Sequence, residues 1–215
     1  MKFIKKILRK YKYTAKLLEL YFFSKNYLMP KGWFLSRFLL APVDKNNLPL
    51  PWFTYASIHF INQKLENTSF KVFEYGSGNS TLWFASKVKS LCSVEHDKGF
   101  FDQKINEIRS LDNVDYKYIP LKDGYSDKIL EFTNEFDIIV IDGRDRVECA
   151  KKCIKALKDD GVVIWDNSDR DEYAEGYEHF KNNGFRKIDF HGLGPINHKE
   201  WRTSIFYRSN NCFDI

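Results

Sequence analysis

One segment of this chain, KVFEYGSGNSTLWFASKVKSLCSVEHD, constrains the fold more strongly than any other. Residues 71–74 form a short β-branched and aromatic run, which Gly76 and Gly78 interrupt. Residues 81–88 then carry apolar side chains at helical spacing, and residues 91–95 form a second run typical of a strand. The segment predicts a strand, a glycine loop, a helix and a second strand, which is the opening unit of a parallel α/β sheet.

The two predicted strands of this segment end in the acids Glu74 and Glu95. The carboxyl ends of parallel strands share one edge of the sheet, so both acids are expected beside the glycine turn and the helix N-terminus. An acid that closes the second strand, about twenty residues after the first, is placed to accept hydrogen bonds from ribose hydroxyls. The segment therefore predicts a cofactor that contains a nucleoside.

The glycine spacing narrows the choice of cofactor. A dinucleotide-binding loop has its third glycine at the position of Thr81, whose β-branch would obstruct close packing of the helix on the strand. A triphosphate-binding loop is excluded because no Gly-Lys-Ser/Thr follows. Instead, FEYGSGNST resembles the first motif of class I S-adenosylmethionine-dependent methyltransferases, with Ser80 where the third glycine of that motif usually stands. The resemblance extends roughly over residues 52–208 and implies S-adenosyl-L-methionine as the cofactor.

The same resemblance implies where the cofactor binds. The glycine loop and the end of the second strand are expected to hold it, and the turn after the third strand is expected beside the adenine. The cofactor-binding residues expected on this basis are Glu74, Gly76, Ser77, Gly78, Ser80, Thr81, Glu95, His96, Asp123, Gly124 and Asp142.

The remaining chain continues the alternation of helices and strands. Helices are expected at 100–111, 126–132 and 145–157, and strands at 114–121, 136–142, 161–166, 185–191 and 201–208. The last two strands have no helix between them, which resembles the antiparallel hairpin that closes the class I methyltransferase sheet. We therefore predict a doubly wound, mostly parallel, Rossmann-like sheet of seven strands with a C-terminal antiparallel hairpin. A methyltransferase domain would occupy residues 51–215, preceded by a helical extension over residues 1–50.

Polar residues end the fourth and fifth predicted strands, namely Asp142 and the pair Asp166 and Asn167. On neighbouring strands these side chains would emerge together, where three oxygens can chelate a hard cation. The arrangement resembles the magnesium site of cation-dependent O-methyltransferases, although Asp145 stands where those enzymes carry a lysine. The alternative is a site without metal, in which Asp142 is the catalytic base and Asp166 caps the following turn.

Longer strings, among them PLPWFTY, IDGRDRVECAK, IWDNSDR and HGLGPI, are similar to bacterial methyltransferases associated with surface-glycan gene clusters. This resemblance implies O-methylation of a saccharide, glycolipid or small-molecule hydroxyl. Such a hydroxyl needs help to lose its proton near neutral pH. The candidates for the catalytic base are Asp142, Asp145 and His191, the last expected with His198 in the loop between the closing strands. Trp52 and Tyr55, in the proline-rich segment before the first strand, are candidates for a lid.

Charge is concentrated near the N-terminus. Residues 1–45 hold 11 Lys and Arg against 2 acids, a net charge of +9, whereas the rest of the chain has a net charge of −4. Residues 3–22 repeat apolar side chains at helical spacing between lysines, which predicts a basic amphipathic helix. Such a helix can lie on an anionic membrane surface, or it can pack on the domain or on a second subunit in a homodimer. Nucleic acid is a less favoured partner, because no RNA-binding motif is present.

The sequence also bounds the compartment and the class of protein. The longest apolar runs are too short for a membrane span, no secretory signal is evident, and the four cysteines lack a C-x-x-C pair. A cytoplasmic protein is expected, either free or peripheral on the inner face of the membrane. Two other classes stay open: a nicotinamide-dependent oxidoreductase, and a module that binds S-adenosylmethionine or a membrane without catalysis.

Overall fold

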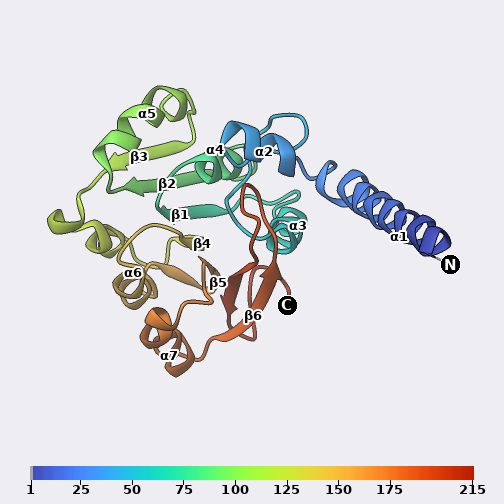
Figure 1. The fold of residues 1–215 in the computed structure, drawn as a ribbon. Helices are drawn as coiled ribbons and strands as arrows, with labels where there is room; N and C mark the ends of the chain where they lie inside the picture. Colours follow the sequence, from blue (N-terminus) through green and yellow to red (C-terminus); the bar gives the residue numbers. More distant parts are fainter. Residues whose placement is uncertain (1) are drawn as a thin grey trace.

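The computed structural model describes the backbone of residues 2–215 and the side chains of residues 11–215. Its centre is a seven-stranded sheet with the order β3-β2-β1-β4-β5-β7-β6 (Figure 1). The strands are β1 Lys71–Tyr75, β2 Ser90–Glu95, β3 Val114–Tyr118, β4 Phe136–Ile141, β5 Leu157–Asp166, β6 Arg186–Gly192 and β7 Trp201–Tyr207. Strand β7 runs antiparallel to both of its neighbours and the other pairings are parallel. The predicted Rossmann-like sheet with its C-terminal hairpin is confirmed.

Helices cover both faces of this sheet. The α-helices are α1 Lys2–Phe23, α2 Trp33–Leu39, α3 Tyr55–Lys64, α4 Asn79–Ala85, α5 Lys98–Ile108, α6 Arg146–Cys153 and α7 Ala174–Asn182. Ile138 and Val140 pack with α3 and α4, whereas Ile139 and Ile141 pack with α6 and α7. Because alternate residues of β4 enter opposite cores, its sequence FDIIVI is apolar without interruption.

Element boundaries differ from the expected ones in several places. The helix expected at 145–157 ends at Cys153, and β5 begins at Leu157, which pairs with Phe136 before a register shift in β4. The segment expected as a helix at 126–132 is a 3-10 helix, Tyr125–Glu131. Helix α4 begins at Asn79, before the expected residue 81, because the Thr81 hydroxyl accepts the Gly78 N–H and closes the turn.

The segment before α3 is folded against the C-terminal hairpin. The Trp33 indole N–H donates to the Asn197 carbonyl, and the Arg37 guanidinium donates to the Ile196 carbonyl, so α2 is held to the loop between β6 and β7. The Ser36 hydroxyl is buried and bonds both backbone groups of Val43. These bonds place the loop after α2 above the carboxyl edge of the sheet.

Helix α1 projects away from the sheet and its helices (Figure 1). Side chains 11–23 are all exposed, so this part of the helix does not pack on its own domain. The alternative in which the helix packs on the domain is therefore not supported for these residues. The side chains of Phe3, Ile4, Ile7 and Leu8, which belong to the predicted apolar face, lie outside the described residues. Within residues 2–215, no helix combines the length and apolar character needed to cross a bilayer.

Candidate functional site

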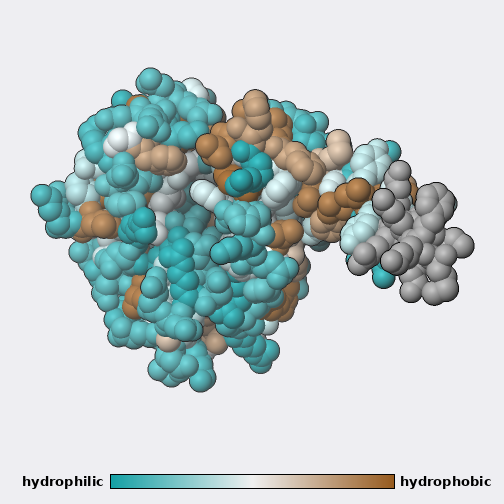
Figure 2. Space-filling model, in the orientation of Figure 1, coloured by the Kyte–Doolittle hydropathy of each residue, from teal (hydrophilic) through white to brown (hydrophobic). Residues whose placement is uncertain are grey.

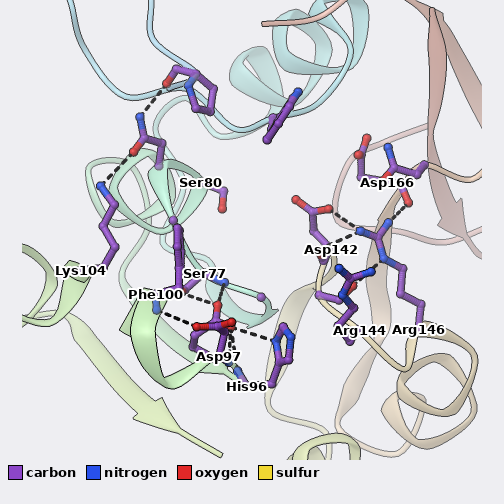
Figure 3. A pocket seen from close by; sticks show the side chains of 18 of the residues that line it. Ser77, Ser80, His96, Asp97, Phe100, Lys104, Asp142, Arg144, Arg146 and Asp166 are labelled. Atoms are coloured by element: carbon purple, nitrogen blue, oxygen red, sulfur yellow. Dashed lines mark hydrogen bonds and ion pairs between the residues drawn. The ribbon is translucent and has the colours of Figure 1, made fainter. Parts of the chain in front are cut away.

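A cavity of about 780 Å³ opens at the carboxyl edge of the sheet. Its walls come from the glycine loop, the ends of β2, β4 and β5, and the loop after α2 (Figure 3). This volume suits a small-molecule ligand. Of the predicted site residues, it is lined by Gly76, Ser77, Gly78, Ser80, Glu95, His96, Asp142, Asp166 and Asn167. Trp52 of the predicted lid also lines it, whereas Tyr55 lines a separate cavity beside α3.

The two loop glycines have different roles. Gly76 has a φ of 85°, and a Cβ there would lie 2.7 Å from the Cα of Gly143. Glycine is therefore required for the loop to pack on the turn after β4. Gly78 has a φ of 150°, and the nearest atom to a Cβ there would be Phe100 Cζ at 3.5 Å. Glycine is thus required at position 78 because other residues rarely adopt this backbone conformation. The absence of a side chain also leaves room on the cavity wall.

Glu74 lies beneath the loop and is fully buried. Its Oε2 accepts hydrogen bonds from the hydroxyls of Thr81 at 2.6 Å and Ser93 at 2.7 Å, while Oε1 has no partner among the described residues. Burial raises the pKa of Glu74 to about 7. Thr81 is also fully buried and contributes to the loop rather than to the cavity wall. Glu74 therefore supports the glycine loop from beneath and is not part of the cavity wall.

Glu74 is expected to make folding stability dependent on pH. A carboxyl whose pKa is raised in the native state stabilises below its unfolded pKa, and this contribution is lost as pH rises through the native pKa. The free energy of unfolding of the wild type, relative to Glu74→Gln, should therefore fall by roughly 3 kcal/mol at most between pH 4.5 and 8. Urea titrations of both proteins across this range measure the difference, and parallel curves would contradict it.

Glu95 closes β2 and holds the other side of the loop. Its Oε2 accepts from the Ser77 N–H at 3.0 Å and the Ser77 hydroxyl at 2.8 Å, and its Oε1 accepts from the N–H groups of His96 and Asp97, each at 2.8 Å. A carboxylate has about four acceptor sites, so these donors fill them. A ribose hydroxyl that binds Glu95 must therefore displace the Ser77 hydroxyl, which has a second partner in the Tyr116 hydroxyl at 2.7 Å.

Asp142 and Asp166 end β4 and β5, and Arg146 lies between these strand ends (Figure 3). The Arg146 guanidinium donates to Asp142 Oδ1 at 2.9 Å, to the backbone carbonyls of Asp142 and Gly143, and to the carbonyl of Asp166. Burial raises the pKa of Asp142 to about 6, against the opposing effect of Arg146. Burial together with the nearby Asp142 raises the pKa of Asp166 to about 8. The Arg146 guanidinium favours the carboxylate form of Asp142 because it contacts Oδ1 of that side chain, whereas its contact with Asp166 is to the backbone carbonyl.

The three predicted magnesium ligands have other partners within the described residues. Asp142 is paired with Arg146, and the Asn167 amide oxygen accepts from Arg170 at 3.3 Å. Asp166 Oδ1 accepts from the Trp201 indole at 3.0 Å and the Thr203 hydroxyl at 2.6 Å. The described part of the chain contains no cluster of three or more His, Cys, Asp or Glu side chains that could hold a metal. The Arg146 guanidinium places a positive charge beside Asp142, which favours the alternative of a site without metal.

Six predicted site residues lie apart from the described wall of the cavity: Glu74 and Thr81 beneath the glycine loop, and Asp123, Gly124, Asp145 and His191. Asp145 precedes α6 with a φ of 52°, and its side chain forms no capping hydrogen bond. His191 belongs to β6 rather than to the loop between the closing strands, and its exposed ring lies 3.6 Å from Glu200. Asp123 and Gly124 form the 3-10 turn and the residue after it, beyond β3. The structure thus leaves Asp142 as the predicted base that faces the cavity.

Several lining residues were not predicted, chiefly Phe100, Lys104, Arg144, Arg146, Arg170, Tyr173 and Asn197. Phe100 reaches the cavity because Asp97 caps α5 by accepting the Phe100 N–H at 2.8 Å, which turns the helix toward the glycine loop. Arg146 follows the fourth strand closely, so its proximity to Asp142 could have been inferred. Arg170 and Asn197 come from loops whose course the sequence pattern does not indicate.

Comparisons with known proteins identify the fold of this chain. No protein-family model and no curated protein sequence matches the chain. Among solved structures, a putative O-methyltransferase from Klebsiella pneumoniae is 16% identical at a TM-score of 0.55, and the match covers 75% of this chain and 83% of that one. Precorrin-6y C5,15-methyltransferase from Geobacter metallireducens is 13% identical at a TM-score of 0.56, covering 74% and 92%.

Spermidine synthase from Thermotoga maritima is also similar, with 18% identity and a TM-score of 0.53. That match covers 69% of this chain and 56% of the synthase, so this chain spans little more than half of the enzyme's length. The neighbours differ in their named reactions, and their identities are low. They establish that this chain has the seven-stranded Rossmann-like fold found in solved methyltransferases.

Proposed function

We propose that this protein is an S-adenosylmethionine-dependent methyltransferase that methylates a hydroxyl group of a saccharide, glycolipid or small molecule. The observation that carries the proposal is one cavity in which the glycine loop and Glu95 face Asp142, a carboxylate with a raised pKa. Two solved proteins of this fold are named as methyltransferases, one of them an O-methyltransferase, which supports the reaction class. Thr81 and the closing hairpin disfavour the nicotinamide alternative.

Each part of the cavity has a role in this proposal. Gly76 and Gly78 let the backbone approach the cofactor, Glu95 binds the ribose, and Glu74 supports the loop from beneath through its hydrogen bond with Thr81. When bound, S-adenosylmethionine supplies an electrophilic methyl group. Asp142 accepts the proton of the acceptor hydroxyl, because its raised pKa brings a carboxylate closer to the basicity that proton transfer requires. Arg146 holds the Asp142 carboxylate in place through the hydrogen bond to Oδ1.

Calorimetry with S-adenosylhomocysteine tests the cofactor. The wild type should bind it, and Glu95→Gln should weaken binding by about 1 to 3 kcal/mol, roughly five- to 150-fold, through the loss of charge-assisted hydrogen bonds. Ser77→Ala is the matched control: it removes the hydroxyl that competes for Glu95, so affinity should not fall. Binding of NADH by a wild type that ignores S-adenosylhomocysteine would refute the proposal.

A further inference from the structure

An exposed apolar surface runs from α1 to the candidate site. It includes Leu18 and Phe22 on α1, Met29 after it, Phe38 and Leu40 on and beside α2, and Trp52. We call these six residues the N-terminal apolar surface. Phe38 is 84% exposed and Leu40 is 74% exposed, although both are large apolar side chains. Figure 2 shows apolar residues gathered over α2 and continuing toward α1, while most of the remaining face is hydrophilic. Contiguous apolar exposure of this kind marks an interaction site.

The charge of this region indicates the kind of partner. Residues 1–45 carry a net charge of +9, with Glu19 and Asp44 as the acids, whereas the rest of the chain is net negative. At 100° per residue, Lys12 lies about 80° from Phe22 and so flanks the pair Leu18 and Phe22, whereas Lys16 lies about 160° from Leu18 on the other side of α1. An apolar stripe flanked by lysines is the pattern of helices that lie in the interface of anionic bilayers, since the lysine heads reach the lipid phosphates.

A second copy of this chain is a poorer partner for the same surface. A twofold contact would bring two segments of +9 charge together, and like charges oppose such an approach. An anionic bilayer instead supplies both the negative charge and the apolar layer. The side chains of residues 11–23 are exposed around the helix, which leaves the stripe available for insertion.

This surface is continuous with the cavity. Leu40 and Trp52 belong to the N-terminal apolar surface and also line the cavity, and both are exposed, so they lie at its rim. The Pro42 carbonyl accepts a hydrogen bond from the Asn79 side-chain amide at 2.8 Å, which holds this rim to α4 and the glycine loop. A bilayer that contacts the N-terminal apolar surface would therefore meet the mouth of the cavity.

We propose that the N-terminal apolar surface docks on an anionic lipid bilayer and turns the mouth of the cavity toward the lipid. Resting on the proposed function, this assigns the acceptor to lipid-linked molecules whose hydroxyl lies at the membrane surface. The docking itself depends on the surface alone. It can therefore be measured without turnover, and it stands or falls separately from cofactor binding.

Sedimentation with vesicles tests the docking, using the full-length protein with phosphatidylcholine vesicles that contain or lack phosphatidylglycerol. We expect binding to the anionic vesicles at low salt, weaker binding at high salt, and at least a tenfold loss for Lys12→Glu/Lys16→Glu and for Leu18→Asp/Phe22→Asp. The matched control is Lys122→Glu/Lys181→Glu, which changes the net charge equally on exposed positions outside this surface and should retain binding. Absence of binding at low salt, or equal loss in the control, overturns the proposal.

Two further readings make the outcome specific. Brominated lipids should quench tryptophan fluorescence in the wild type and less in Trp52→Phe, and equal quenching would refute the orientation of the cavity mouth.

Sedimentation velocity should show a monomer without lipid, whereas a dimer lost in Leu18→Asp/Phe22→Asp would assign the surface to a second copy. S-adenosylhomocysteine affinity should be the same for the wild type, Lys12→Glu/Lys16→Glu and Leu18→Asp/Phe22→Asp. If none of these proteins binds it, the proposed function fails and the docking is unaffected.

Discussion

Replacing Asp142 by asparagine is expected to lower kcat for transfer to the acceptor hydroxyl by about a hundred- to ten-thousandfold, the usual contribution of a general base. Asparagine keeps the shape of the side chain but cannot accept the proton. Because burial raises the pKa of Asp142 to about 6, the wild-type rate should also fall as pH drops through this value, where the carboxylate becomes protonated. The residual rate of Asp142→Asn should lack this acidic limb.

Three measurements separate a loss of the base from a loss of structure. Asp142→Asn should bind S-adenosylhomocysteine within about threefold of the wild type, since the four donors to Glu95 come from elsewhere in the loop. Asp145→Asn and His191→Gln should keep wild-type turnover, because both residues lie apart from the cavity wall. Near wild-type turnover by Asp142→Asn would move the base to another group.

The strand and loop chemistry near the cofactor site could be predicted from sequence because it depends on local pattern. The run FEYGSG specifies a strand end and a turn by residue type alone, and Glu95 follows at a distance set by one helix and one strand. Asp142 and Asp166 were also placed correctly at neighbouring strand ends, since β4 pairs with β5 in parallel. These positions follow from the order of elements.

The rest of the site depends on tertiary contacts that have no local pattern. The sequence allowed either a metal among Asp142, Asp166 and Asn167, because three oxygens at one edge are typical ligands, or a site without metal in which Asp142 is the base. Whether a nearby cation already occupies that edge depends on the direction in which Arg146 leaves α6. His191 was expected at the junction of the strand 185–191 and the following loop, but β6 continues to Gly192 through pairing with Trp201. Strand length is set by the partner strand, which one segment does not reveal.

Removing Arg146 should be the most destabilising single change at the site. Arg146→Ala leaves Asp142 and Asp166 without their cation and deprives three backbone carbonyls of a donor. Loss of one partner of a buried ion pair costs about 3 to 5 kcal/mol. The loss in unfolding free energy should be larger at pH 8 than at pH 5.5. The raised pKa values of Asp142 and Asp166 favour their protonated forms below about pH 6. A protonated carboxyl needs no counter-charge, so the absence of Arg146 then costs less. Urea denaturation at the two pH values measures it.

The same variant tests whether the guanidinium occupies the place of a metal. With the side chain shortened, Asp142 and Asp166 face a space without a cation, where a divalent ion can bind. Magnesium should therefore raise the Tm of Arg146→Ala at pH 8 and leave the wild-type Tm unchanged. Arg144→Ala is the matched control, because it removes the same charge from an exposed side chain of the cavity wall. Its unfolding free energy should stay within about 0.5 kcal/mol of the wild type. Magnesium should not change its Tm. A rise in the wild-type Tm with magnesium would contradict this expectation. It would show that the ion binds while Arg146 is in place, and it would support the metal site at Asp142, Asp166 and Asn167.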